Sequence, residues 1–192
     1  MKIFSIRITI VFTSILLCFS HFTLSAQTKG TLTDSDDGRT YKTINIGNQW
    51  WMAENLNYFI EDGSWCYNND SANCAKYGRL YNWETAMRAC PRGWHIPTKA
   101  EFEVLIGNVG DENTNAYNQL IKKDTSGFKA LLGGSLNNND IFNDLNINGY
   151  FWTSSKDYLD HIWYLNLYSE NSNAFFYFSK NVVGLSVRCL KN

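Results

Sequence analysis

The chain has 192 residues, of which 44% are hydrophobic and 16% aromatic, and its formal net charge at pH 7 is −1. This length permits a single domain with a sizeable core, and the aromatic content argues against disorder. Only 18% of the residues are charged and the two signs nearly balance. We therefore expect neither a nucleic-acid partner nor a polybasic membrane patch.

The first residues have the pattern of a secretory signal peptide. Lys2 and Arg7 precede an apolar run over residues 8–19, and Ala26 offers a small residue at the cleavage point. We predict a signal peptide over residues 1–26.

The expected mature domain spans residues 27–192 and contains no membrane-spanning segment. We expect it in the periplasm, on the outer-membrane surface or in the medium. An uncleaved membrane anchor is one alternative. Lipidation of Cys18 is another, which Leu17 disfavours because lipid-modified cysteines normally follow Gly, Ala or Ser.

Cysteine content supports export. Cleavage would remove Cys18 from the five cysteines and leave Cys66, Cys74, Cys90 and Cys189. An even number in an exported chain predicts two disulfides, with three connectivities open, and free buried thiols are the alternative.

The mature chain begins with a pattern of strands and hairpins. An Asp-Gly pair at 37–38 lies between segments 31–33 and 40–46, and a Gly-Asn pair at 47–48 leads to segment 49–53. Such pairs favour tight turns between antiparallel strands.

Helices are predicted in the middle of the chain. Residues 58–77 are rich in Asn, Asp, Ser and Gly and predict a loop, and a helix follows over residues 83–89. Thr98 and Glu101 have the spacing of a capping box, which predicts a helix that ends at Gly107.

A third helix is predicted over residues 115–123, and the last third of the chain returns to strands. The predicted strands are 128–132, 150–154, 161–168, 174–178 and 185–190, with a long loop over 133–149. In the last strand, alternation places Val187 and Cys189 inward and Ser186 and Arg188 outward. The order predicts an α+β fold with two or three helices, long loops and an antiparallel sheet whose first and last strands pair.

Five motifs resemble a known family. They are GRTYKTINIGNQWWMAENL at 38–56, YGRLYNW at 77–83, CPRGWHIPT at 90–98, GYFWTSS at 149–155 and GLSVRC at 184–189. In this order they resemble the Fibrobacter succinogenes major paralogous domain, which is common in exported proteins of Bacteroidota and Fibrobacterota. The resemblance implies a distant relation to the C-type lectin-like superfold, which also includes formylglycine-generating enzymes.

The resemblance also implies a disulfide pairing. In the C-type lectin-like superfold a helix cysteine is bonded to a cysteine of the last strand. Cys90 and Cys189 stand at the matching places, which leaves Cys66 to pair with Cys74.

The sequence lacks the complete motifs of calcium-dependent sugar binding. C-type lectins that bind sugar through calcium use Glu-Pro-Asn or Gln-Pro-Asp followed by Trp-Asn-Asp. This chain has no proline after Pro97, so the first motif is absent, and residues 142–144 match the second motif only in part. The long loop offers Asn139, Asp140 and Asp144, which are residue types typical of turns. We expect no cofactor, and calcium at these carboxylates is the alternative.

Aromatic side chains are the remaining candidates for ligand binding, because an aromatic ring stacks on the apolar face of a sugar. Trp50, Trp51, Trp83, Trp94, Trp152 and Trp163 are predicted in the core, and Tyr58, Phe59, Trp65, Tyr67, Tyr158, Phe175 and Tyr177 in loops or on exposed strand faces. The predicted ligand-binding residues are Trp65, Tyr67, Asn139, Asp140 and Asp144.

No catalytic or metal-binding motif is recognised. His95 and His161 lack a nearby thiol or carboxylate pattern, and His95 is expected to fix its loop through hydrogen bonds. We predict a non-enzymatic exported module for adhesion or binding, with a glycan or cell-envelope ligand. A structural or assembly protein of the cell envelope is the alternative. A formylglycine-generating-like enzyme ranks third, because it would need reduced copper-binding cysteines.

Overall fold

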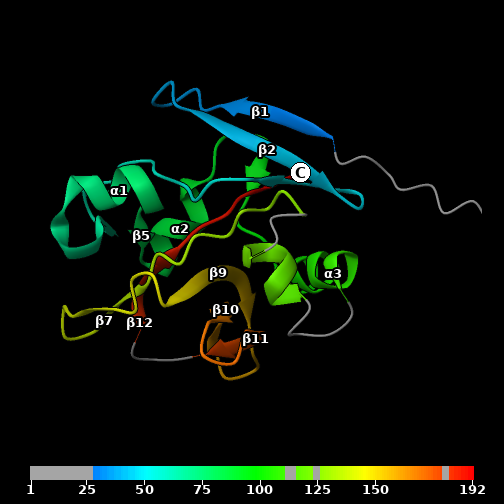
Figure 1. Ribbon diagram of the computed structural model, residues 1–192. Helices are drawn as coiled ribbons and strands as arrows, with labels where there is room; N and C mark the ends of the chain where they lie inside the picture. The colour runs from blue at the N-terminus through cyan, green and yellow to red at the C-terminus, as the bar shows by residue number, and fades with distance from the viewer. Residues whose placement is uncertain (1–27, 111–115, 123–125, 179–181) are drawn as a thin grey trace, which may run out of the picture.

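The computed structural model describes residues 28–110, 116–122, 126–178 and 182–192 (Figure 1). The predicted signal peptide lies outside the described residues. Within them, no helix combines the length and the apolarity needed to cross a membrane. The fold is α+β with the C-type lectin-like layout, in which two sheets rich in antiparallel pairs pack with short helices.

The first sheet joins the two ends of the described chain. Its strands, in spatial order, are β1 (Lys29–Thr33), β2 (Thr40–Ile46), β3 (Gln49–Met52), β13 (Leu190–Lys191) and β6 (Trp94–His95). Both predicted hairpins are present, and their turns contain Gly38 and Gly47 at positive φ angles of 72° and 61°, which glycine adopts without steric cost. The last strand pairs with β3 and β6, whereas β1 pairs with β2.

The second sheet carries the longest hairpin. Its strand order is β11 (Asn173–Phe178), β10 (Ile162–Tyr168), β9 (Asn148–Lys156), β12 (Val182–Ser186), β5 (Leu80–Tyr81) and β4 (Ser64–Trp65). A small hairpin of β7 (Ser135–Asn137) and β8 (Phe142–Asn143) attaches to β12. The β9–β12 pair is parallel, while β9, β10 and β11 form antiparallel pairs.

The described helices are short. They are α1 (Ser71–Tyr77), α2 (Trp83–Ala89), α3 (Lys99–Val109), the single-turn η1 (Tyr67–Asn69) and the π-helical turn η2 (Asn118–Lys122). The predicted capping box is confirmed: the Glu101 amide donates to Thr98 Oγ1 at 3.1 Å, and the Thr98 amide donates to Glu101 Oε2 at 2.7 Å. The helix continues past Gly107 and reaches its C-cap at Gly110.

Two core layers lie on opposite faces of the second sheet. On one face, Phe151 of β9 and Leu165 of β10 pack in the same cluster as Trp51 of β3 and Phe102 of α3. On the other face, Trp152 packs in a cluster that includes residues of α2 and β12. The alternation of strand residues thus supplies both cores from the same hairpin, and α2 and α3 cover different faces (Figure 1).

Both disulfides join the predicted partners. Cys90, at the end of α2, is bonded to Cys189 before β13, with 5.8 Å between their Cα atoms. Cys66 is bonded to Cys74 across η1 and α1, with 4.9 Å between their Cα atoms. The Cys90–Cys189 bond lies in the core layer on the α2 side, and the Cys66–Cys74 bond fixes the short surface helix α1.

Three local predictions are wrong. Residues 58–77 contain α1 and η1, and residues 133–149 contain the β7–β8 hairpin, so neither segment is a simple loop. The segment 128–132 forms no strand; its backbone carbonyls at Phe128 and Lys129 accept hydrogen bonds from Arg188 instead.

Arg188 itself was expected to point outward and is fully buried. Strand β12 ends at Ser186, so the predicted alternation does not continue to Arg188. The guanidinium donates to Asn55 Oδ1 at 2.8 Å and to the Lys129 carbonyl at 2.6 Å, and also to the Phe128 carbonyl. Burial lowers the pKa of Arg188 to about 9, so the side chain is charged at neutral pH.

Candidate functional site

The predicted ligand-binding residues lie on two neighbouring parts of the surface. Trp65 belongs to β4 and Tyr67 to η1, whereas Asn139 and Asp140 lie in the turn between β7 and β8. The ring of Tyr67 packs on the ring of Phe142 in β8, with 5.1 Å between centroids. This contact joins the α1 region to the small hairpin, which Figure 1 shows next to each other.

The carboxylates and amides of this region support turns. Asp140 and Asp144 have positive φ angles of 57° and 65°. The backbone amide of Asn139 donates to Asn137 Oδ1, and Asp144 Oδ2 accepts from the Tyr150 hydroxyl at 2.6 Å. Among the described residues, no group of three or more His, Cys, Asp or Glu side chains is arranged to hold a metal ion.

A second group of aromatic side chains extends across β9, β10 and β11. We call it the tyrosine face; it comprises Tyr150, Tyr164, Asn166, Tyr168, Phe175 and Tyr177. Tyr164 stands between Tyr150 and Tyr177, with centroid distances of 6.0 and 6.1 Å. The register places Asn166 opposite both Tyr150 and Phe175. The rings therefore form a continuous ladder across three strands, with one amide side chain in their midst.

The tyrosine face is open at one end and buried at the other. Tyr177 is 55% exposed, and Tyr150, Tyr168 and Phe175 are half-buried. Tyr164 is buried beside Trp152, where the sheet meets the core on the α2 side. The exposed rings are therefore accessible to a ligand, while the core fixes the buried end of the face.

Asn166 is the unusual polar residue of this face. Its side chain is 8% exposed, and in the described part of the chain its Oδ1 atom has no hydrogen-bond partner. Buried polar atoms in proteins are almost always hydrogen-bonded, because an unpaired one costs about 1–3 kcal/mol. Because this oxygen is almost fully covered, it lies out of a ligand's reach and is an internal feature of the face.

The hydroxyls of Tyr150, Tyr164 and Tyr168 keep their protons at physiological pH. Burial raises the pKa of Tyr164 to about 12. Burial, reinforced by the hydrogen bond to Asp144, also raises the pKa of Tyr150. Tyr168 donates its hydroxyl proton to Glu170, and this bond raises its pKa. These three rings are therefore neutral.

The sequence contained a signal for this face that the loop-based reasoning missed. Phe175 and Tyr177 were expected to be accessible, but Tyr150, Tyr164 and Tyr168 were not singled out. In β10, Tyr164, Asn166 and Tyr168 alternate with the apolar residues of the opposite face. This period of two places all three on one side of the strand.

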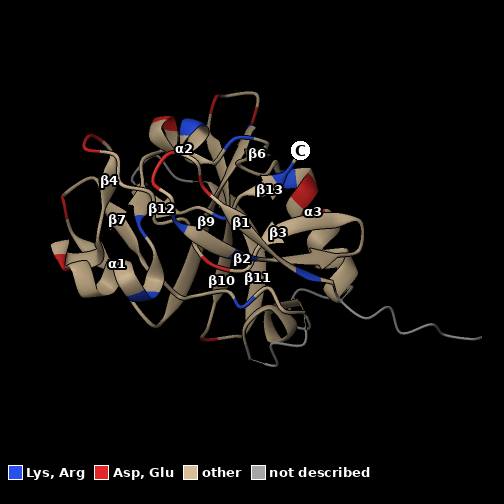
Figure 2. Ribbon diagram, turned by 90° about the horizontal axis from the view of Figure 1, so that it is seen from above, with Lys and Arg blue, Asp and Glu red and all other residues tan. Residues whose placement is uncertain are grey.

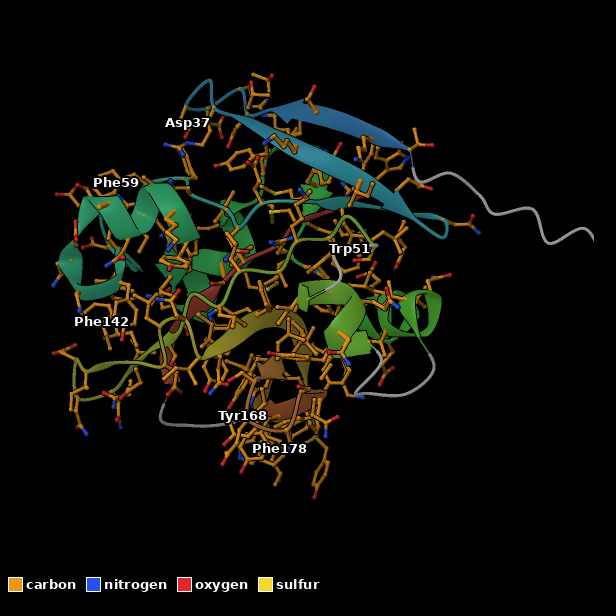
Figure 3. All side chains as sticks on the ribbon, viewed as in Figure 1. Asp37, Trp51, Phe59, Phe142, Tyr168 and Phe178 are labelled. Carbon is orange, nitrogen blue, oxygen red and sulfur yellow. A yellow bond between two sulfur atoms is a disulfide. The ribbon has the colours of Figure 1, made fainter. Side chains whose placement is uncertain are left out.

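A separate hollow lies between the turn after β1, the segment that leads into β4, and α1. It has a volume of about 560 Å³ and is lined by Arg39, Phe59 and Arg79, among others. The guanidinium of Arg79 lies over the Phe59 ring at 4.7 Å from its centroid. Figure 3 shows Phe59 and Asp37 at this end of the molecule, far from Tyr168 and Phe178 on the second sheet.

The two histidines support loops. The His95 ring contacts Asn192 Oδ1 at 2.7 Å and Glu101 Oε1 at 3.1 Å, which confirms the expected role of His95 in fixing its loop. His161 Nδ1 lies 2.8 Å from Asp157 Oδ2, and its ring stacks on Phe178. Each imidazole is thus engaged with a carboxylate of its own neighbourhood.

These features define a disulfide-bonded α+β domain of C-type lectin-like layout with a ladder of exposed and half-buried rings. The Fibrobacter succinogenes major domain matches residues 44–191, and the chain belongs to that family. No curated protein and no solved structure matches the chain.

Proposed function

We propose that the protein is an exported, non-enzymatic binding module whose tyrosine face holds a glycan of the cell envelope or the surroundings. The observation that carries the proposal is the ladder of rings from Tyr150 to Tyr177, which ends in the exposed ring of Tyr177. Aromatic rings stack on the apolar C–H faces of pyranoses, so the exposed and half-buried rings of this face offer a contact surface for a sugar. Neutral polysaccharides suit this face because its rings are uncharged.

Export is supported by the cysteines. Cys66–Cys74 and Cys90–Cys189 are both bonded, and disulfides persist in oxidising compartments. The proposal also includes the cleavage of residues 1–26. The surface charge fits a soluble exported domain, because basic and acidic segments are interspersed over the described ribbon (Figure 2).

Several observations favour binding over catalysis. The four mature cysteines are in disulfides, which leaves no thiol pair for the copper chemistry of a formylglycine-generating enzyme. His95 and His161 each contact a carboxylate and an aromatic or amide group of the fold. These side chains support the architecture.

The test is a glycan array probed with the exported protein, with and without a calcium chelator. Positive polysaccharides are then titrated against Tyr177→Ala and Tyr158→Ala. Tyr158 is a matched control, because it is 92% exposed and lies in the turn at the other end of the β9–β10 hairpin from Tyr150 and Tyr168.

Loss of the Tyr177 ring should weaken glycan binding about tenfold, which corresponds to about 1.4 kcal/mol, while Tyr158→Ala leaves it unchanged. Both variants should melt near the wild-type temperature, since both rings are exposed. The proposal fails if no glycan is bound, or if Tyr177→Ala binds as tightly as the wild type. A structural or assembly role would then be the better reading.

A further inference from the structure

The hollow beside α1 is lined by an arginine that has no carboxylate partner among the described residues. Arg79 lies on its wall, and among the described residues no carboxylate pairs with this guanidinium. Its Nη1 atom is 3.4 Å from Ser64 Oγ, and its central carbon lies over the Phe59 ring. The arginine is thus held by a hydroxyl and a ring, neither of which neutralises its charge.

The supports of Arg79 are themselves fixed. Ser64 Oγ donates to the Ile60 carbonyl at 2.6 Å and accepts from the Ile60 amide at 3.1 Å. The Arg79 amide donates to the Leu56 carbonyl at 2.9 Å. The positive charge therefore occupies a position that is organised before any ligand arrives, which lowers the entropy lost on binding.

A second arginine lines the same hollow. Arg39 Nε is 4.0 Å from Asp37 Oδ2, at the outer limit of an ion pair. The other carboxylate oxygen of Asp37 accepts from the Arg39 amide at 2.8 Å, so Asp37 mainly stabilises its own turn. Two guanidinium groups and one carboxylate therefore line the cavity, with a net positive charge.

Size and polarity limit the ligand. A volume of about 560 Å³ lies within the range of small-molecule sites. Phe59 is 60% exposed and offers an apolar surface beside the cation. Arginine binds carboxylate and phosphate through paired N–H donors.

We propose that this hollow is a second binding site, which takes a sugar bearing a carboxylate or phosphate group. The anion contacts Arg79, the sugar ring lies against Phe59, and Arg39 faces the same anion from the neighbouring wall. This site is distinct from the tyrosine face in position and in ligand charge. A protein with both sites holds a neutral chain on one surface and an acidic sugar on another.

The experiment is isothermal titration calorimetry on the exported protein with four probes. Galacturonate tests the carboxylate, glucose 6-phosphate tests the phosphate, inorganic phosphate tests the anion alone, and galactose tests the neutral ring. The variants are Arg79→Gln and the control Arg92→Gln, which removes the same charge from an exposed turn outside the hollow. Arg39→Gln is the substitute if Arg79→Gln fails to fold.

We expect galacturonate or glucose 6-phosphate to bind at least tenfold more tightly than galactose and inorganic phosphate. Arg79→Gln should weaken that binding at least tenfold, and Phe59→Ala should weaken it too, while Arg92→Gln leaves it intact. The proposal is overturned if neither acidic sugar binds, or if inorganic phosphate or galactose binds equally well. It is also overturned if Arg79→Gln and Arg92→Gln lose binding to the same extent. Tyr177→Ala should not affect these titrations, so this result is separable from the fate of the tyrosine face.

Discussion

Arg188 shows how one side chain ties distant segments together. Its guanidinium reaches Asn55 after β3 and the carbonyls of Phe128 and Lys129, and it lies 4.4 Å from the centroid of the Phe128 ring. Alternation in the last strand predicted an exposed arginine, because a sequence pattern contains no information about carbonyls that arrive from elsewhere in the fold. Its burial follows from tertiary contacts.

Replacement of Arg188 should strongly destabilise the domain. Arg188→Met removes the donors and leaves buried acceptors unpaired, each at a cost of about 1–3 kcal/mol, so we expect a loss of roughly 3 kcal/mol or more. Arg188→Lys should also destabilise, because an ammonium cannot span the same acceptors. Urea unfolding measures the free energy, with Arg92→Met as the exposed control, expected to change by less than about 0.5 kcal/mol. Equal stability of the Arg188 and Arg92 variants would contradict this account.

Asn166 should cost the fold stability without contributing to binding. Leucine has nearly the same shape, and Asn166→Leu removes an acceptor that has no donor. We expect the free protein to be unchanged or more stable, because an unpaired buried polar atom is replaced by an apolar group. Glycan affinity should stay the same, because the Oδ1 atom is covered and out of a ligand's reach. Thermal melting and glycan titration of one protein batch test both parts, and a variant that melts much earlier would show that the amide supports the fold instead.

At the level of elements, local signals were the most predictive. The glycine turns and the capping box depend on residues a few positions apart, so the sequence alone located them correctly. Helix α1 was missed, although its Asp70 N-cap and the Cys66–Cys74 bond are local. The segment 128–132 is held by Arg188, far along the chain, and was also assigned wrongly. The same holds for the candidate site: Phe175 and Tyr177 were found as accessible rings, but the ladder needs the register of three strands.

The capping box makes part of the stability depend on pH. Burial raises the pKa of Glu101, but hydrogen bonds from Thr98 and His95 outweigh burial, and the net pKa lies below the ordinary value of 4.5. A lowered carboxylate pKa contributes stability that is fully present above pH 4.5 and is lost as the pH falls through the folded-state pKa.

Glu101→Gln should therefore lower the melting temperature and the free energy of unfolding at pH 7, the latter by up to about 1 kcal/mol, because glutamine keeps an acceptor for the Thr98 amide but loses the charge near the helix N-terminus. The difference from the wild type should shrink steadily below pH 4.5. Glu103→Gln is the control on the same helix, because it removes an exposed partner of Lys99 and should have a smaller effect. A difference that stays constant down to pH 3 would contradict the linkage.

The two disulfides should differ in their contribution. Cys90–Cys189 joins residues separated by 99 positions, for which the chain-entropy model gives about 4.7 kcal/mol. Cys66–Cys74 joins residues separated by 8 positions and gives about 2.6 kcal/mol by the same relation. Cys189→Ser should thus unfold or strongly destabilise the domain, whereas Cys74→Ser should be milder. Urea unfolding of the exported variants ranks them, and the reverse order would contradict the model.

At the scale of the whole molecule, fold and export depend on each other. The loss expected for the larger disulfide alone is a large fraction of the total stability of a typical domain, about 5–15 kcal/mol. A chain kept in a reducing compartment would lose both bonds. Export through the proposed signal over residues 1–26 is therefore required for the two disulfides to form and persist.

The mature protein should begin at Gln27. The basic start, the apolar run and Ala26 place the cut there, and both disulfides should already be closed in the exported form. Intact-mass measurement of protein from the cell envelope or the medium should give the mass of residues 27–192 less four hydrogens, which reduction restores. A mass that retains residues 1–26, or a lipid on Cys18, would contradict the cleavage. A mass without the loss of four hydrogens would contradict disulfide closure and remove the physical reason for export.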